Sequence, residues 1–390
     1  MAKRSLHAPE AQSVTFVELF FDLVFVFAVT QVTVLTAGDL TVEGVARSLL
    51  LFWLIWWAWT QFTWTLNPAD TSHTAVRALT LLGTAIAFVM AASVTRAFGD
   101  EAAWFAVPYV LVRVVGLGLQ VRIDLERADL RNRAISVWAG LSGIGLALVL
   151  VGALVDTPGR YWIWLGAIVA DLVAAGMAGG RQEWDLDTEH FSERHGLFVI
   201  IALGESLIVA ATAVSVDERT GSLVAVTAAA LAVACLLWWT YFAWVKDAIE
   251  EGFASTPPEV LGATARDAFS LGHFPLVCGI IGFAIAIEEI VHHPSDVPSG
   301  EVTAALGAGV TLYVVAAAFS LWRTSRVILW PRLGILGLTV AGLAIVSTAD
   351  AVWQLGVVAV GLAIIALVEA RAPCIDVSNP LSERVADAKS

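Results

Sequence analysis

Long apolar runs, separated by short polar segments, dominate the pattern of this chain. A window of about 19 residues finds runs that are mostly near the length of about 20 residues needed to cross a bilayer as a helix. The runs lie near residues 14–36, 43–66, 74–97, 102–121, 133–155, 160–179, 195–215, 221–245, 264–289, 302–321, 333–348 and 351–370. This pattern predicts an all-α, polytopic integral membrane protein with about twelve transmembrane helices.

Composition agrees with a membrane protein and argues against several soluble classes. Of the 390 residues, 58% are hydrophobic and 15% are charged, so the apolar runs cannot all be buried in one soluble core. The formal charge of −13 falls mostly in the connectors and therefore says little about partners. Walker, GxGxxG, HExxH and GxSxG motifs are missing from the sequence. Nucleotide binding and standard hydrolase chemistry therefore have no support.

Neither a cofactor nor a metal site is predicted. Cys235, Cys278 and Cys374 lie far apart, with no CxxC pair. Two histidines at 292–293 follow two glutamates at 288–289 and are interpreted as an exposed acidic rim, with a weak metal site as the alternative. The expected partners are the lipid bilayer, a small solute or ion, and protons, not nucleic acid. A homo-oligomer is left open.

The distribution of positive charge predicts the orientation. If the N-terminus is cytoplasmic, most of the 22 Lys and Arg residues lie inside and Arg113 lies within a helix. Four lie outside, namely Arg47, Arg96, Arg160 and Arg219. Because cytoplasmic loops carry an excess of Lys and Arg, we expect a bacterial inner (plasma) membrane protein with both termini in the cytoplasm. The chain ends in a short polar tail from about residue 372.

Similar segments recur in the same order in the two halves of the chain. The matches are "FVELFFDLVFVFA" (16–28) with "FSERHGLFVIIAL" (191–203), "WLIWWAW" (53–59) with "CLLWWTYFAW" (235–244), and "TAVRAL" (74–79) with "ATARDAF" (263–269). They predict an internal repeat of two parallel six-helix halves, as some transporters have. The halves are 1–182 and 183–390, with the seam in the linker 179–190.

Two acids lie in the first apolar run. An ionisable side chain at bilayer depth costs at least ~2.5–3.5 kcal/mol on insertion scales, so each needs a partner, a water-filled cavity or a function. Glu18 could cap the helix by bonding the Thr15 amide. Asp22 lies roughly 12 Å into the helix, beyond the reach of a cap, and is expected to be paired or functional. Their spacing of four residues places both acids on one helix face.

The run near 195–215 carries charges of two kinds. Glu193 and Arg194 are interpreted as a solvated helix end, whereas His195 fits a solvated or a functional role equally well. Glu205 lies about 15 Å farther along the helix than His195, near the midplane. Because no cap explains a carboxylate at that depth, Glu205 is the best single candidate for a functional residue.

Three further ionisable residues lie deep in predicted helices. His273 is followed by Pro275, which is expected to kink the helix and free a carbonyl nearby. Arg113 and Asp171 lie midway along their helices, which predicts a buried charge pair. That pair could be structural, or it could set the charge state of Glu205.

Tryptophans cluster in two of the apolar runs. Packing or interfacial anchoring explains such residues in membrane helices. The alternative is an aromatic cavity that binds a cation or an apolar ligand. The residues in question are Trp53, Trp57, Trp238 and Trp239.

Three segments resemble the signature segments of the bacterial low temperature requirement A (LtrA) family. They are "ELFFDLVFVFAVTQ" (18–31), "ERHGLFVIIALGESLI" (193–208) and "HFPLVCGI" (273–280), and their order and spacing match over nearly the whole chain. The resemblance implies a multipass membrane protein linked to growth in the cold, without a settled biochemical activity. A weaker similarity of residues 20–25 to a lysosomal potassium channel family does not extend to that family's filter residues.

The residues favour a transport protein, either a transporter or a channel, for a small solute or ion with proton linkage. Asp22, Glu205 and His273 are expected to converge between the halves near mid-membrane, where desolvation and neighbouring charges control protonation. Glu18 and His195 are expected on the same proton or ion pathway. The alternatives are an intramembrane enzyme or a lipid- or quinone-binding protein that uses the same Asp/Glu/His cluster, and a passive structural protein whose buried charges are satisfied pairs.

Overall fold

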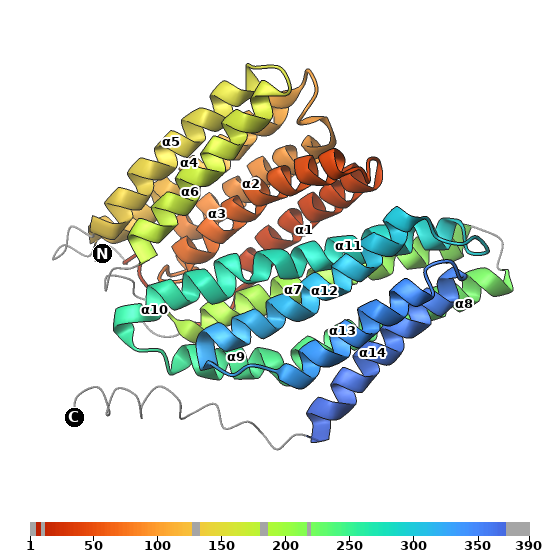
Figure 1. The fold of residues 1–390 in the computed structure, drawn as a ribbon. Helices are drawn as coiled ribbons and strands as arrows, with labels where there is room; N and C mark the ends of the chain where they lie inside the picture. Colours follow the sequence, from red (N-terminus) through yellow and green to blue (C-terminus); the bar gives the residue numbers. More distant parts are fainter. Residues whose placement is uncertain (1–4, 9–11, 127–132, 180–185, 217–219, 372–390) are drawn as a thin grey trace. The chain divides into compact units, whose positions relative to one another are not determined.

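The computed structural model describes residues 5–8, 12–126, 133–179, 186–216 and 220–371, and these residues are almost entirely helical (Figure 1). Within that part of the chain, the β-structure is limited to one isolated bridge between His7 and Ala69. The helices form two compact units. Unit 1 contains the described residues up to Phe198 together with Pro257–Arg266, and unit 2 contains Val199–Thr256 and the described residues from Asp267 onward.

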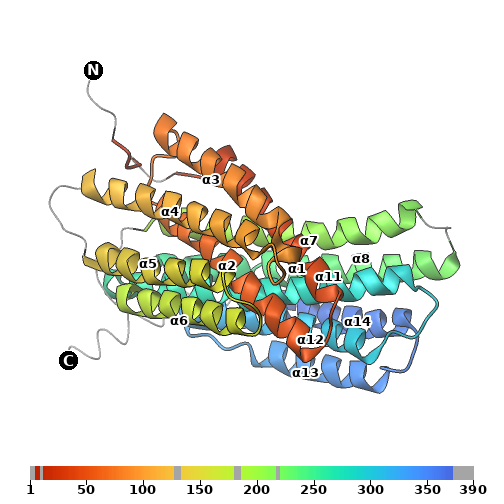
Figure 2. The same ribbon diagram turned by 90° about the horizontal axis from the view of Figure 1, so that it is seen from above.

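Unit 1 is built mainly from helices that are close to one another in sequence. Helix α1 packs on α2 and α3, α4 packs on α3 and α5, and α5 packs on α6, the last pair side by side in both ribbon views (Figures 1 and 2). The helices are α1 (Phe16–Ala37), α2 (Val42–Leu66), α3 (Thr74–Ala92), the short 3-10 helix η1 (Val94–Arg96), α4 (Ala102–Glu126), α5 (Arg133–Ala153), α6 (Gly159–Gly179) and α10 (Pro258–Ala265). The first part of α7 (Thr188–Val216) also belongs to this unit.

Unit 2 is built around the pair α11 and α12, which lie side by side (Figure 1). Helix α14 packs on α8 and α13, and α9 packs on α12. The helices are α8 (Gly221–Phe242), α9 (Val245–Ala254), α11 (His273–His292), α12 (Gly300–Ser325), α13 (Trp330–Ile345) and α14 (Ala351–Arg371), with the later part of α7.

The helices have the length and composition of membrane spans. Nine segments of the described chain are long and apolar enough to cross a bilayer, and two shorter apolar helices, Trp138–Ala153 and Trp330–Ile345, accompany them. The chain is therefore an all-helical membrane protein, as the hydropathy pattern predicts. The count of twelve spans and the internal repeat stay predictions. Residues 180–185, within the predicted seam, and the tail from 372 lie outside the described residues.

The segment before His273 differs from the expected helix with a proline kink. Helix α10 is followed by a π-helical turn, Arg266–Leu271, and α11 then begins at His273. Pro275 consequently lies in the first turn of α11, where a backbone N–H has no helical partner to lose. The irregular backbone precedes the proline, and π-helical turns of this kind are frequent at functional sites.

Candidate functional site

Helix α7 begins at Thr188, seven residues before the predicted run. This earlier start places His190 and Arg194 on the helix, and both side chains are fully buried at 0% exposure. Interpreting Arg194 as a solvated helix end was therefore wrong. The reason is tertiary, because the first turns of α7 pack inside unit 1 instead of reaching solvent.

Asp22 on α1 accepts two strong hydrogen bonds on one oxygen. Arg194 Nη2 lies 2.5 Å from Asp22 Oδ1, and Trp59 Nε1 of α2 donates to the same oxygen at 2.7 Å. The carboxyl group is fully buried. Its second oxygen, Oδ2, is buried and has no hydrogen-bond partner among the residues that the structure describes.

Glu18, one turn earlier on α1, combines the two roles that its position suggested. Its Oε2 accepts from the Thr15 amide at 2.9 Å and from the Thr15 hydroxyl at 2.8 Å, as in a capping box. Its Oε1 lies 3.0 Å from His190 Nε2 and 3.6 Å from Arg194 Nη1. Glu18 is thus both a cap and a member of a buried ionic group.

We call Glu18, Asp22, His190 and Arg194 the α1–α7 cluster. All four side chains are 0% exposed, and the cluster holds two carboxylates against one guanidinium. Sequence reasoning found the two acids but missed His190 and misplaced Arg194. The available signal was their spacing of four residues, which places them on one face of a helix and matches the spacing of the two acids on α1.

Arg113 and Asp171 form a second buried group, in which charges are equal. Arg113 Nη2 lies 2.9 Å from Asp171 Oδ1, and Nη1 lies 3.2 Å from Oδ2, so both carboxylate oxygens are engaged. Tyr109 accepts from Arg113 Nη1 at 2.8 Å, and Gln61 bonds both the side chain and the carbonyl of Arg113. The pairing expected from their matched depth is therefore present in the structure.

Helix α2 supplies hydrogen bonds to both buried groups. Trp59 donates to Asp22, and Gln61, two residues later, contacts Arg113. Trp53 and Trp57 stack with their ring centroids 5.5 Å apart. Helix α2 therefore contributes hydrogen bonds to buried charged groups in addition to packing, because its indole and amide groups bond to Asp22 and Arg113.

Trp238 and Trp239 on α8 lie in a different environment. Their side chains are 39% and 52% exposed, and Trp238 stacks on Phe242 of the same helix. The tryptophans of α2 are mostly buried, whereas these two lie on the outside of unit 2. The four residues proposed for an aromatic cavity therefore do not share one kind of surroundings.

His273 belongs to a hydrogen-bonded group within unit 2. Its Nδ1 lies 3.0 Å from the Ala268 carbonyl in the π-helical turn, and its Nε2 lies 2.7 Å from the Tyr241 hydroxyl. Since a carbonyl can only accept, Nδ1 carries the proton and Tyr241 donates to Nε2. Ser320 also donates to the Ala268 carbonyl, at 2.7 Å. The imidazole and the serine together satisfy a carbonyl that the irregular backbone leaves available.

The remaining predicted residues of the proton pathway are on α7. His195 is buried, with Nδ1 2.9 Å from the Phe191 carbonyl and its ring edge-on to Trp59. The side chain of Glu205 lies outside the described residues. Asp22 lies in unit 1 and His273 in unit 2. The expected convergence of Asp22, Glu205 and His273 therefore stays a proposal.

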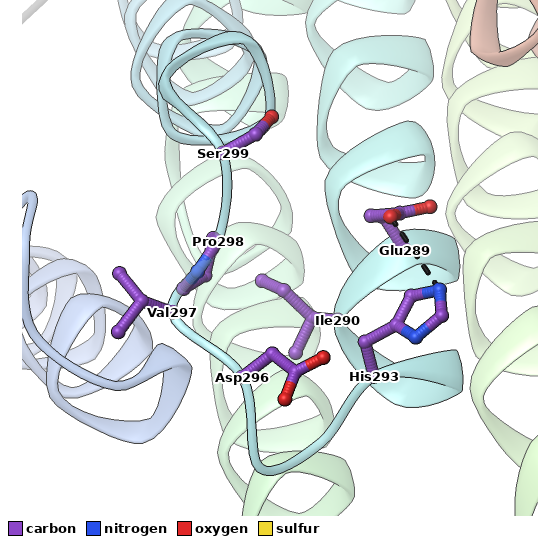
Figure 3. A pocket seen from close by; sticks show the side chains of 7 residues that line it. All are labelled: Glu289, Ile290, His293, Asp296, Val297, Pro298 and Ser299. Atoms are coloured by element: carbon purple, nitrogen blue, oxygen red, sulfur yellow. Dashed lines mark ion pairs between the residues drawn. The ribbon is translucent and has the colours of Figure 1, made fainter.

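A shallow pocket of about 270 Å³ lies where the loop after α11 leads into α12 (Figure 3). Glu289 and His293 face each other there, with His293 Nε2 3.7 Å from Glu289 Oε1, and Asp296 lies on the loop beside them. Both members of the pair are more than half exposed. Within the described part of the chain, no group of three His, Cys, Asp or Glu side chains is placed to hold a metal ion.

Comparison with known proteins gives two sequence matches. Residues 13–367 match the sequence profile of the family described as "Bacterial low temperature requirement A protein (LtrA)". An uncharacterized protein from Rhizobium meliloti (strain 1021) is 28% identical over 327 residues, which are 80% of this chain and 78% of the relative. No solved structure matches the chain.

Proposed function

We propose that this chain, which belongs to the bacterial low temperature requirement A family, is an inner-membrane protein that moves a small solute or ion with proton linkage. The observation that carries the proposal is the α1–α7 cluster. It places two carboxylates and one guanidinium at 0% exposure in a bundle of membrane helices. One negative charge in the cluster lacks a positive partner among the described side chains unless a proton or cation binds.

Buried charge is costly, which makes this imbalance informative. Removing an ion from water costs several kcal/mol even after relaxation, and an opposite charge with good hydrogen bonds offsets that cost. The Arg113 and Asp171 pair meets that condition with one charge of each sign. The α1–α7 cluster does not, and intramembrane carboxylates with this property are typical of proton and ion pathways.

The proposed mechanism couples the charge of the cluster to movement of the two halves. A proton that binds the cluster removes its net charge and lowers the cost of a closed, dry arrangement. The protein would be two parallel six-helix halves, twelve spans in all with both termini cytoplasmic, that rock on each other during transport. Glu205, farther along α7, and His273 belong to the same proposed pathway.

The test is coupled transport in liposomes that contain a pH-sensitive dye. Wild-type protein is reconstituted, and ions and small solutes are added in turn. We expect at least one of them to drive a change in internal pH, and we expect Asp22→Asn to abolish it. Asp39→Asn is the matched control, since it makes the same chemical change at a carboxylate in the loop between α1 and α2. It is expected to keep full activity.

Two results would overturn this proposal. One is full pH-coupled movement in Asp22→Asn, with the variant folded as judged by gel filtration. The other is the absence of coupled movement for every ion and solute tested. In that second case, a lipid or quinone that co-purifies with the protein would favour the alternative of an intramembrane enzyme that uses the cluster as acid and base.

A further inference from the structure

The α1–α7 cluster contains three groups that could take a proton, and its geometry distinguishes among them. We propose that Asp22 binds the proton, that the proton lies on Oδ2, and that His190 is held as a neutral Nε2–H donor that does not carry it. Only the coupling of this proton to transport rests on the proposed function. Four observations carry the inference.

The first observation fixes the orientation of Asn67, at the end of α2. Its Oδ1 accepts from the Asp187 amide at 2.9 Å, and its Nδ2 donates to the Asp187 carbonyl at 2.9 Å. Rotating the amide by half a turn would place two acceptors together and two donors together. The backbone of Asp187 therefore determines which atom of Asn67 faces α7, and that atom is the nitrogen.

The second observation fixes the protonation of His190. Asn67 Nδ2 lies 3.3 Å from His190 Nδ1. Because an amide nitrogen can only donate, Nδ1 must accept, so the single proton of the neutral ring lies on Nε2. An imidazolium would place an N–H of the ring against an N–H of Asn67. The neighbour of His190 thus disfavours its protonated form.

The third observation concerns Glu18, which is surrounded by donors. Two donors of Thr15 occupy Oε2, and His190 Nε2 and Arg194 Nη1 face Oε1 at 3.0 and 3.6 Å. The His190 contact has the distance of an ion pair but not the alignment of a regular hydrogen bond. A proton on Oε2 would displace the Thr15 donors, and a proton on Oε1 would lie beside the Nε2–H of His190 and the guanidinium of Arg194, so Glu18 stays ionised.

The fourth observation is the free oxygen of Asp22. Arg194 and Trp59 both bond Oδ1, and Oδ2 is buried without a hydrogen-bond partner among the described residues. A proton there forms one O–H bond and displaces no donor. The carboxylate becomes a carboxylic acid, and the charge of the cluster changes from −1 to zero. Glu18 Oε1 also lacks a regular hydrogen bond, but it faces His190 and Arg194, so Asp22 Oδ2 is the carboxylate oxygen of the cluster at which a proton meets no donor among the described residues.

Among the described residues, the other charged groups near α1 do not supply the missing charge. Arg77 on α3 is exposed and donates to the Thr71 carbonyl, and Arg96 in η1 pairs with Glu101 at the surface. On the α7 side, Glu193 accepts from the Val14 amide, and Asp187 accepts from the His190 amide. These two groups are acidic, so neither of them neutralises Asp22. His195 lies with its ring edge-on to Trp59, with the ring centroids 5.0 Å apart.

The experiment is infrared spectroscopy of the full-length protein in liposomes at neutral pH, with and without ¹³C label in the aspartate carboxyl groups. We expect a C=O band of a protonated carboxylic acid that shifts with the aspartate label and is lost in Asp22→Asn. His190→Gln keeps a donor toward Glu18 but cannot titrate, and we expect it to retain the band. Glu18→Gln removes one negative charge from the cluster, so Asp22 should ionise there and the band should weaken.

A second measurement reads the histidine directly. In ¹⁵N spectra, the signals lost in His190→Gln identify His190, and we expect one protonated and one unprotonated ring nitrogen. Two protonated nitrogens at neutral pH would overturn the assignment. The absence of a carboxylic acid band in the wild type would also overturn it. If an aspartate carboxylate band responded to added sodium instead, the site would bind a cation and not a proton.

These spectra need no transported substrate, which separates the two proposals. A carboxylic acid band without any coupled movement in liposomes would support the proton site and overturn the proposed function. Coupled movement with a protonated His190 would support the proposed function and overturn this inference. If Asp22→Asn fails to insert, the His190→Gln and Glu18→Gln spectra still decide the matter.

Discussion

At the scale of single residues, Arg113 and Arg194 are both buried guanidiniums in unit 1 with opposite kinds of surroundings. Arg113 faces one carboxylate and uses both of its oxygens. Arg194 faces two carboxylates and leaves Asp22 Oδ2 without a partner among the described side chains. We therefore propose a structural role for the Arg113 and Asp171 pair and proton binding for the α1–α7 cluster. A proton that binds the cluster removes its net charge, whereas a proton that binds the pair would create one.

The structural assignment of Arg113 predicts a rescue. Arg113→Ala leaves Asp171 buried and unpaired, which costs about 3–5 kcal/mol for a buried pair. We expect a strong fall in expression and in the midpoint of thermal unfolding in detergent. Removing Asp171 as well, in the double variant with Asp171→Ala, should recover part of both, since the orphaned charge is the main cost.

The outcome has a clear alternative. If expression and the unfolding midpoint of the double variant are no higher than those of Arg113→Ala alone, the unpaired carboxylate of Asp171 is not the cause of the destabilisation. The important partner of Arg113 would then be another residue, such as Gln61. The side chain of Gln61 bonds both the guanidinium and the carbonyl of Arg113, and these contacts would be lost or altered in Arg113→Ala.

At the scale of elements, α11 and α12 approach each other so closely that only glycine fits at their crossing. A Cβ built on Gly309 would lie 2.7 Å from the Phe283 amide nitrogen and 2.8 Å from the Gly279 carbonyl oxygen. Both are backbone atoms that cannot move aside. Small residues at such crossings are a general device for packing helices in membranes, and this one holds the helix that carries His273 against the helix that carries Ser320.

We expect Gly309→Ala to destabilise the protein by about 1–3 kcal/mol, the usual cost of overpacking a core. The measurement is the thermal unfolding midpoint in detergent. Gly334→Ala is the matched control, because it is also a helical glycine but a Cβ there meets nothing within 4 Å. That variant should be neutral or slightly more stable, since alanine favours helices. Equal effects in the two variants would contradict a close crossing.

At the scale of the whole molecule, the distribution of Lys and Arg residues predicts an orientation in the membrane with both termini in the cytoplasm. In a protein with Cys235, Cys278 and Cys374 replaced, single cysteines at positions 98 and 157 should react with an impermeant reagent in intact cells. A cysteine at 328, between α12 and α13, should react only after the cells are opened. Labelling of position 328 from outside would reverse the orientation, although it would leave the α1–α7 cluster unchanged.

The sequence by itself determined the class of protein and most of its elements. Apolar runs of about 20 residues specify membrane helices because a bilayer satisfies no backbone hydrogen bonds, so each segment must satisfy its own. The same local logic placed Glu18 and Asp22 on one face of α1, marked Thr15 as a cap, and matched Arg113 with Asp171 by depth. These are properties of single helices, or of depth measured along them.

The tertiary structure alone decided which charges meet. Arg194 lies 172 residues from Asp22 in sequence, and its burial depends on α7 starting inside unit 1 beside α1. The hydrogen bond from Trp59 to Asp22 and the contact between Asn67 and His190 also join residues that are far apart in sequence. Helical periodicity says which residues share a face, but the partner of that face depends on which helices pack together. That choice is a long-range property, and it turned two acids in a membrane helix into a cluster with one unbalanced charge.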